Sequence, residues 1–437
     1  MSNASNTVSN NFATSPKTFF IEKAILTTNK DKEIDLKNII QDIKVSESIY
    51  QSGIIVSIFV LDTVALIDRL KLAGNEKIDL VIQRREITNR EKKKFELSVN
   101  IAEIKDYSEP RPSSRSYTLQ CLSKHVYLNN TRVLKKSFEG SISKLISNIV
   151  TSELQSKMFY RNTSTNNIKG IYPRIRPLSA IHWLLRNAYE DGTPYFFYET
   201  TKNGITLDSY KHLLDQDVFH TYDNIPNFKN TARDKLEDLY EEERSKIKKV
   251  NSQMNISKFK GLSAGAYGSQ LHKIDIYDKK VEAPIKYRYK APYKLNANAP
   301  ITADMKIANT TLTQIDEAKN YFISYNSGSY SNFENYHSPT DQSILKAEAY
   351  HHNLNSIIQE ITIPGDFDLE SGNLIELSIQ KSADVTEEIL EGQEFKDEML
   401  SGKHLVTGIV HHFSSEGYFM KVKAKKDSFI KGLDKGL

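Results

Sequence analysis

One short stretch of this chain has the residue types of a hydrolase active site. Gly261-Leu262-Ser263-Ala264-Gly265 fits the G-x-S-x-G motif, in which a strained turn between a strand and a helix exposes a nucleophilic serine. The residues that follow, Leu271–Tyr277, alternate apolar with polar and predict a strand instead of the required helix. We therefore interpret the stretch as a glycine-rich β-turn and predict that the protein is not an enzyme.

Two pairs of adjacent histidines are candidate metal ligands, His351-His352 and His411-His412. Neighbouring side chains point to opposite faces of a strand and diverge by about 100° on a helix, so neither pair can bind one ion unaided. The chain also lacks the H-E-x-x-H, C-x-x-C and P-loop motifs. We expect no metal ion and no cofactor.

Two charged stretches are candidates for contacts between protein surfaces. Residues 84–94 are mainly basic and residues 384–398 mainly acidic, and the simpler interpretation is two solvated hairpin tips. The alternative is that the basic hairpin of one copy meets an acidic surface of a neighbour, because complementary charge sets register and partner choice. The candidate interface residues are Arg84, Arg85, Arg90, Lys92, Lys93, Lys94, Glu387, Glu388, Glu391 and Glu394.

The charged stretches occupy the same place in two similar runs of predicted strands. Each run begins with a turn, Gly74-Asn75 or Gly372-Asn373, and each strand alternates apolar with polar residues. The matched order predicts one folding unit that occurs twice. A sheet of five or six such strands must be covered or close into a barrel. The corresponding strands are 78–83, 95–101 and 117–122 in the first run and 375–380, 405–410 and 418–422 in the second.

The remaining segments complete an α+β, β-rich protein with two similar β-barrel domains, a small α+β domain and an insertion domain. Helical spacing predicts helices at 141–154 and after Pro177, and helices are also expected in the charged segment 231–250 and at 341–354. Strands are expected at 195–198, 205–207, 255–260 and 270–279. The expected division is a disordered N-terminal tail 1–16, a first β-barrel domain 17–125, a small α+β domain 126–225, a second β-barrel domain 226–282 and 345–430, an insertion domain 283–344 and a C-terminal tail 431–437.

Composition fits a soluble protein of several domains. The chain has 437 residues, of which 39% are hydrophobic and 26% charged, and its longest apolar runs are far shorter than the ~20 residues of a membrane span. A net charge of +4 is too small to indicate nucleic-acid binding. The single cysteine, Cys121, excludes an intrachain disulfide. The 23 Tyr and 19 Phe favour protein interfaces, where an amphipathic ring is useful.

Parts of the second run resemble the second barrel of T-even-type phage baseplate hub proteins, which are related to the hub portion of type VI secretion spike proteins. The Ile181-His182-Trp183 helix is similar to the second domain of that family, and the order of elements matches over roughly 20–428. The segments that carry the resemblance are 361–377, with the sequence ITIPGDFDLESGNLIEL, 401–412, with the sequence SGKHLVTGIVHH, and 425–428.

The resemblance implies a homotrimer whose six similar barrels form a pseudo-sixfold ring between a hexameric tail tube and a trimeric central spike. DNA would pass through the lumen only as cargo. The implied partners are the tail tube or a tube-initiator protein, a separate spike protein and the surrounding wedge proteins, with no membrane binding. The implied location is the virion tail baseplate, after assembly in the host cytoplasm. Another tube-adaptor or baseplate structural protein and a tail-associated hydrolase stay open as alternatives.

Overall fold

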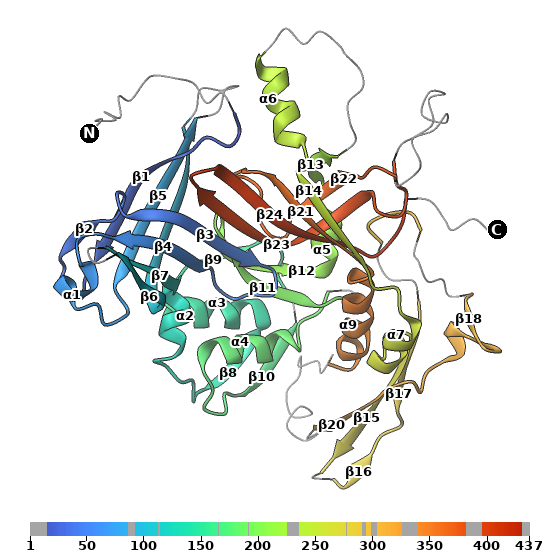
Figure 1. Cartoon of the computed structure of the whole chain (residues 1–437). Helices are drawn as coiled ribbons and strands as arrows, with labels where there is room; N and C mark the ends of the chain where they lie inside the picture. Colours follow the sequence, from blue (N-terminus) through green and yellow to red (C-terminus); the bar gives the residue numbers. More distant parts are fainter. Residues whose placement is uncertain are drawn as a thin grey trace, which may run out of the picture.

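A computed structural model shows a β-rich protein whose main body is one large sheet (Figure 1). In the part of the chain that the model describes, this sheet contains 13 strands, mostly antiparallel. The described residues are 15–85, 92–111, 114–164, 166–190, 192–224, 236–276, 278–290, 294–298, 304–325, 340–381 and 396–430.

The first half of the sheet is built by residues 20–123. Its strands pair in the order β3-β4-β7-β6-β5-β1-β2, so that β5, β6 and β7 form an antiparallel meander. The predicted alternation is present, since Ile78, Leu80 and Ile82 of β5 are buried. The elements are β1 (Phe20–Thr27), β2 (Glu33–Asp35), β3 (Ile40–Ser48), β4 (Ile55–Asp62), α1 (Leu66–Leu70), β5 (Lys77–Arg85), β6 (Lys92–Arg111) and β7 (Ser114–Ser123).

The second half of the sheet comes from two segments separated by an insertion. Its strands pair in the order β14-β21-β24-β23, with β22 beside β23 and β13 beside β22. Strands β22, β23 and β24 form a second antiparallel meander. The elements are β13 (Val218–Asp223), α6 (Leu236–Ser245), β14 (Lys249–Met254), β21 (Ile357–Pro364), β22 (Leu374–Ser378), β23 (Gly402–Ser414) and β24 (Gly417–Lys426).

The two halves share their strand pairing in register. Strands β3, β4, β5, β6 and β7 correspond to β14, β21, β22, β23 and β24, and each pair of neighbours is antiparallel in both halves. Strand β6 has one extra residue between Ile101 and Glu103 where it pairs with β7. Strand β23 has one at the same place, between Val406 and Gly408. A shared β-bulge supports the predicted repeat strongly, because bulges are specific features of a fold.

The turn that opens each meander also repeats. The amide of Asn75 donates to the carbonyl of Ile101 at 2.7 Å, and the amide of Gly372 donates to that of Val406 at 2.8 Å. Asn75 rather than Gly74 therefore corresponds to Gly372, one residue away from the predicted alignment. Both corresponding residues have positive φ, 72° and 96°. The halves differ at one place, since β1 runs antiparallel to β5 whereas β13 runs parallel to β22.

One hydrophobic cluster takes side chains from both halves. The Phe95 ring of β6 lies 5.4 Å from Phe367 and 5.5 Å from Phe413 between ring centres, so β6 packs directly on the second half. The predicted closed barrels are not confirmed. In the described residues the order of strand pairing is an open path, and the two halves share this cluster instead of having separate barrel interiors.

A small α+β unit lies below the first half of the sheet in Figure 1 and has its own hydrophobic cluster. Buried Leu145, Ile146 and Ile149 form the predicted apolar face of α3, and Gly204, with φ 74°, turns the predicted β11–β12 hairpin. The elements are α2 (Lys124–Asn129), β8 (Ser137–Ser141), α3 (Ile142–Ser152), β9 (Met158–Tyr160), β10 (Asn167–Ile171), α4 (Pro177–Leu185), β11 (Tyr195–Thr200), β12 (Gly204–Ser209) and α5 (Tyr210–Leu214).

The insertion between β14 and β21 projects away from the large sheet in Figure 1. Strand β15 lies at its centre and pairs with β16, β17 and β20. No helix of the described residues is long and apolar enough to cross a membrane. The elements are α7 (Lys258–Ala264), β15 (Gly268–Asp275), β16 (Lys280–Val281), β17 (Ile285–Arg288), β18 (Lys306–Ile307), β19 (Thr310–Thr311), the 3-10 helix η1 (Leu312–Gln314), β20 (Asn320–Tyr325) and α9 (Thr340–Leu354).

Candidate functional site

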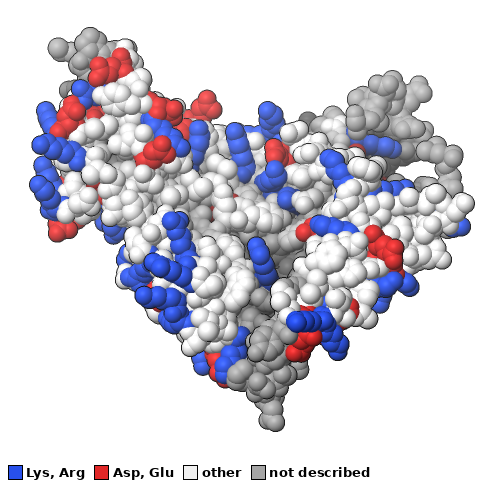
Figure 2. Space-filling model, turned by 90° about the horizontal axis from the view of Figure 1, so that it is seen from below, with Lys and Arg blue, Asp and Glu red and all other residues white. Residues whose placement is uncertain are grey.

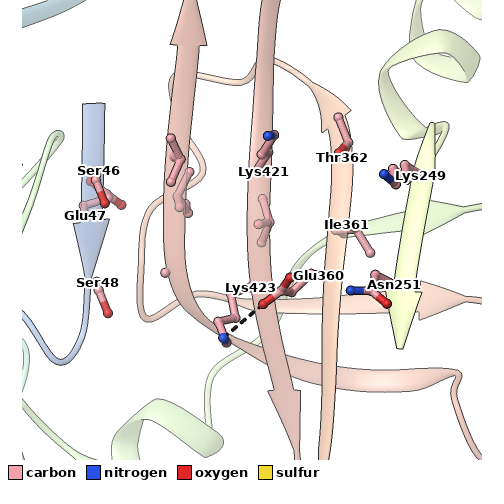
Figure 3. A pocket seen from close by; sticks show the side chains of 14 residues that line it. Ser46, Glu47, Ser48, Lys249, Asn251, Glu360, Ile361, Thr362, Lys421 and Lys423 are labelled. Carbon is pink, nitrogen blue, oxygen red and sulfur yellow. Dashed lines mark hydrogen bonds and ion pairs between the residues drawn. The ribbon is translucent and has the colours of Figure 1, made fainter. Parts of the chain in front are cut away.

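The exposed face of the large sheet is hollowed where its two halves meet (Figure 3). The depression has a volume of about 460 Å³ and is formed by β14, β21, β24, β23 and β3. Gly408 lies in it without a side chain, beside the line along which β23 pairs with β3. The lining residues are Ser46, Glu47, Ser48, Lys249, Asn251, Glu360, Ile361, Thr362, Gly408, Ile409, Val410, Lys421, Val422 and Lys423.

Apart from Val410, the side chains on this face are polar, and they carry more positive than negative charge. Lys249 of β14 and Lys421 and Lys423 of β24 lie on opposite sides of β21. The Lys423 Nζ forms an ion pair with Glu360 Oε1 of β21 at 3.0 Å, drawn as a dashed line in Figure 3. An ion pair this exposed contributes little to stability. The depression therefore suits a surface that faces water, and it contains no nucleophile paired with a base.

Charge on the face of the molecule drawn in Figure 2 is mixed. On the face seen in Figure 2, Lys and Arg side chains are scattered among neutral residues, with Asp and Glu between them. A protein that binds a nucleic acid concentrates basic residues on one face. This view agrees with the small net charge of +4.

Glu47 connects the junction of the two halves to other parts of the chain. Its side chain is buried, and its two carboxylate oxygens accept hydrogen bonds from the amides of Thr201 at 2.7 Å and Ser371 at 2.6 Å. Burial raises the pKa of Glu47 to about 7, although these two hydrogen bonds act in the opposite direction. The residue thereby fixes β3 against the β11–β12 turn and the loop before β22, a role that sequence patterns did not reveal.

Close packing explains the residue types Gly365 and Asp366, which directly follow β21. A Cβ on Gly365 would lie 1.9 Å from Cδ1 of Tyr418, so only glycine fits beside that ring. The next residue, Asp366, is buried, and its Oδ2 lies 2.6 Å from Nη2 of Arg244 on α6. Burial raises the pKa of Asp366, but the charges of Arg244 and Arg84 and the hydrogen bonds from Arg244 and the Asp368 amide together outweigh burial and lower that pKa below its usual value. The segment thus anchors α6 to the sheet.

Arg84, the first residue of the basic stretch 84–94, lies in the interior of the protein and not at a solvated hairpin tip. Arg84 is buried, and its guanidinium donates to the Gly365 carbonyl and to the Tyr240 hydroxyl. Strong desolvation of an arginine requires such partners. Arg84 therefore holds three segments of its own chain together.

Two lysines of the basic stretch form ion pairs with other residues of the same chain. Lys93 forms an ion pair with Asp368, and Lys94 forms one with Glu22 at 3.2 Å. Arg85 ends β5 and Lys92 begins β6, and the two residues are paired in the ladder. The contact between charged stretches of two copies stays a prediction, because Arg90, Glu387, Glu388, Glu391 and Glu394 lie outside the described residues.

The candidate nucleophile and the candidate metal ligands form hydrogen bonds with other residues of the fold. Ser263 lies in the last turn of α7, where its hydroxyl donates to the Phe259 carbonyl at 3.0 Å, so the predicted β-turn is a helix end. His352 hydrogen-bonds to Tyr267 at 3.1 Å, and buried His411 to Tyr418 at 2.8 Å. Among the described residues, no three His, Cys, Asp or Glu side chains are grouped to hold a metal ion.

Comparison with known proteins shows a likeness in fold without a likeness in sequence. No protein-family model matches the chain, and no curated protein is similar to it. A tail protein from Neisseria meningitidis MC58 superposes with a TM-score of 0.53 at 11% identity, covering 93% of this chain and 96% of that one. The 43 kDa tail protein of prophage MuSo2 from Shewanella oneidensis gives 0.51 at 10% identity, covering 94% and 100%.

These comparisons define the class of fold. Both matches extend over nearly the whole of each chain, so the likeness concerns the overall fold and not one part of the chain alone. The predicted resemblance to phage tail proteins is confirmed at the level of the fold.

Proposed function

We propose that this protein is the structural hub of a contractile-tail baseplate. Three copies form a pseudo-sixfold ring that joins a hexameric tail tube to a trimeric central spike. The observation that carries this proposal is the strand arrangement that occurs twice in one chain, including the bulges after Ile101 and Val406. Three copies of a doubled unit present six similar units around a threefold axis, which matches six tube subunits on one side and three spike chains on the other.

The proposal assigns surfaces and partners to the ring. Each half of the sheet acts as one barrel-like unit, and the tail tube or a tube-initiator protein and the spike bind opposite faces of the ring. Wedge proteins surround it. The polar face with Lys249, Lys421 and Lys423 is the surface that we assign to the lumen, because a passage for DNA must be filled with water. The protein is then a component of the virion tail, assembled in the host cytoplasm.

Native mass measurement of the purified chain tests this proposal. The expected result is a species of about 150 kDa, three times the chain mass of 50.0 kDa, that binds a purified spike trimer one to one. A hexamer would favour another tube adaptor instead. A stable monomer at micromolar concentration, in the presence and absence of the spike, would contradict the hub.

A further inference from the structure

The two halves of the sheet are joined by one pair of strand edges. Strand β23 pairs with β22 through Gly402–Leu405, and after the bulge at Thr407 the same edge pairs with β3. In this second stretch Gly408 lies opposite Ser48 and Val410 opposite Ser46. One strand thus meets two different partners along one edge, and the bulge marks the change.

Strand β6 has the same construction as β23, but its second stretch lacks the second partner. It pairs with β5 as far as Asn100 and bulges after Ile101. From Glu103 to Lys105 it pairs with β7 on one side, and no strand of the described residues lies on the other. Glu103 and Lys105 are exposed. The edge of β6 that corresponds to the β3-binding edge of β23 is therefore open.

Strand β14 presents the complementary open edge. It is the counterpart of β3, since β3 pairs with β4 and β14 pairs with β21. The edge that in β3 meets β23 has no strand beside it at β14 within the described part of the chain. Val250 is half-buried and the other five residues of β14 are exposed. Unpaired strand edges are templates for pairing with another chain, and polar residues limit that pairing to the intended partner.

We propose that β14 of one copy pairs antiparallel with the Glu103–Lys105 stretch of β6 in the next copy, as β3 pairs with β23 within each chain. This inference rests on the proposed ring and identifies the two edges that close it. Each copy then offers one edge of each kind, so the contact is head-to-tail and not that of a two-fold dimer, and a threefold rotation between copies closes it into a ring. Six equivalent junctions result, three within chains and three between them.

The internal junction also fixes the register. Ser46 corresponds to Gln253, because Ser46 pairs with Ile55 of β4 and Gln253 with Ile358 of β21. Val410 corresponds to Lys105, because each is the third residue after its bulge. Gln253 is therefore expected opposite Lys105 of the next copy. A second irregularity in β6 between Lys105 and Ser108 has no counterpart in β23, so the register is transferred no further.

Disulfide trapping tests this register in the full chain. In the variant Lys105→Cys/Gln253→Cys, the two Cβ atoms would lie about 5 Å apart across the interface, close enough for a disulfide. Mild oxidation should link most chains into dimers and trimers on a non-reducing gel. Burial raises the pKa of the native Cys121 thiol to about 12, so it stays protonated and does not interfere.

Matched controls use the same strands. Lys105→Cys/Lys249→Cys places the second cysteine four residues along β14, about 13 Å from the expected position, and should give little linkage. Ser46→Cys/Val410→Cys places the same pair at the internal junction and should form an intrachain disulfide. If the variants are trimers by native mass but the Lys105–Gln253 pair links no better than the control, the strand pairing is wrong and the hub proposal survives. If they are monomers, the ring itself is wrong.

Discussion

At the residue scale, the sequence letters that carry the family resemblance are explained by packing around the Tyr418 ring. Gly365 leaves room for this ring, and the Tyr418 hydroxyl donates to the Asp366 carbonyl at 3.1 Å. The same ring stacks on Phe413, with centres 4.3 Å apart. The residue types Gly365 and Asp366 in this loop therefore match the packing of the sheet interior.

Gly365→Ala is expected to destabilise the protein by about 1–3 kcal/mol or more, because the new methyl group overlaps the Tyr418 ring. Gly408→Ala is the matched control in the same sheet, since its Cβ would meet neighbours at 3.5 Å, an ordinary contact distance. The control should change stability by less than about 1 kcal/mol. Urea unfolding of both variants measures the difference, and equal losses would contradict the packing argument.

His411 predicts a dependence of stability on pH. Burial lowers the pKa of His411 to about 3, so the unfolded chain takes up the proton first and stability is lost as the pH falls from about 6.5 toward 3. His411→Phe cannot bind that proton. The difference in unfolding free energy between His411→Phe and the wild type should therefore shift in favour of the variant by about 1.4 kcal/mol for each pH unit below 6.5.

The comparison requires unfolding curves of both proteins between about pH 7 and about pH 4. Phe413→Leu, on the same strand, removes no titratable group and should differ from the wild type by a constant amount. A difference between His411→Phe and the wild type that stays constant over this range would show that His411 is accessible to protons in the folded protein.

At the scale of elements, sequence patterns predicted those whose own periodicity is strong. The helices around Leu145 and Ile181 and the hairpin with Gly204 form as predicted. The helix expected at 341–354 forms too, although its own periodicity is weak. The strand expected at 255–260 is wrong, because Ser257 caps helix α7 by accepting a hydrogen bond from the Lys260 amide.

The contacts that tie these elements together were missed for a physical reason. Glu47 and Asp366 lie on segments of ordinary pattern, and the partners that make their burial tolerable are distant in sequence, at Thr201, Ser371 and Arg244. Periodicity reports which face of an element is buried, but it cannot report which polar group meets another across the fold. The junction between β3 and β23 was missed for the same reason.

The Arg244–Asp366 ion pair is expected to hold α6 on the sheet. Arg244→Met should cost about 3–5 kcal/mol, because it leaves a buried carboxylate without its compensating charge. Adding Asp366→Asn removes that charge while keeping the acceptor for the Asp368 amide, so the double variant should lose less than the sum of the single ones.

An exposed ion pair is the control for this comparison of single and double variants. Lys77 and Asp79 form an ion pair at 2.9 Å, with Lys77 half-exposed, and Lys77→Met should cost at most about 1 kcal/mol. Additive losses at Arg244 and Asp366 would contradict a coupled buried pair. Equal losses of stability for Arg244→Met and Lys77→Met would also contradict it.

At the scale of the whole molecule, the strand arrangement that occurs twice is the feature from which we propose a ring of three copies. Within the chain, the second half continues the first through β23 and β3. Between chains, the open edges of β14 and β6 allow the same continuation. In the described residues of one copy, the two halves share a hydrophobic cluster and no closed barrel forms.

Cryo-electron microscopy of the purified protein, viewed along the symmetry axis, tests this account most directly. It predicts three chains around a lumen, with six similar sheet units joined edge to edge and the Lys249, Lys421 and Lys423 side facing inward. Three chains held together through the insertion or the small α+β unit, with β14 and β6 of different copies apart, would contradict it.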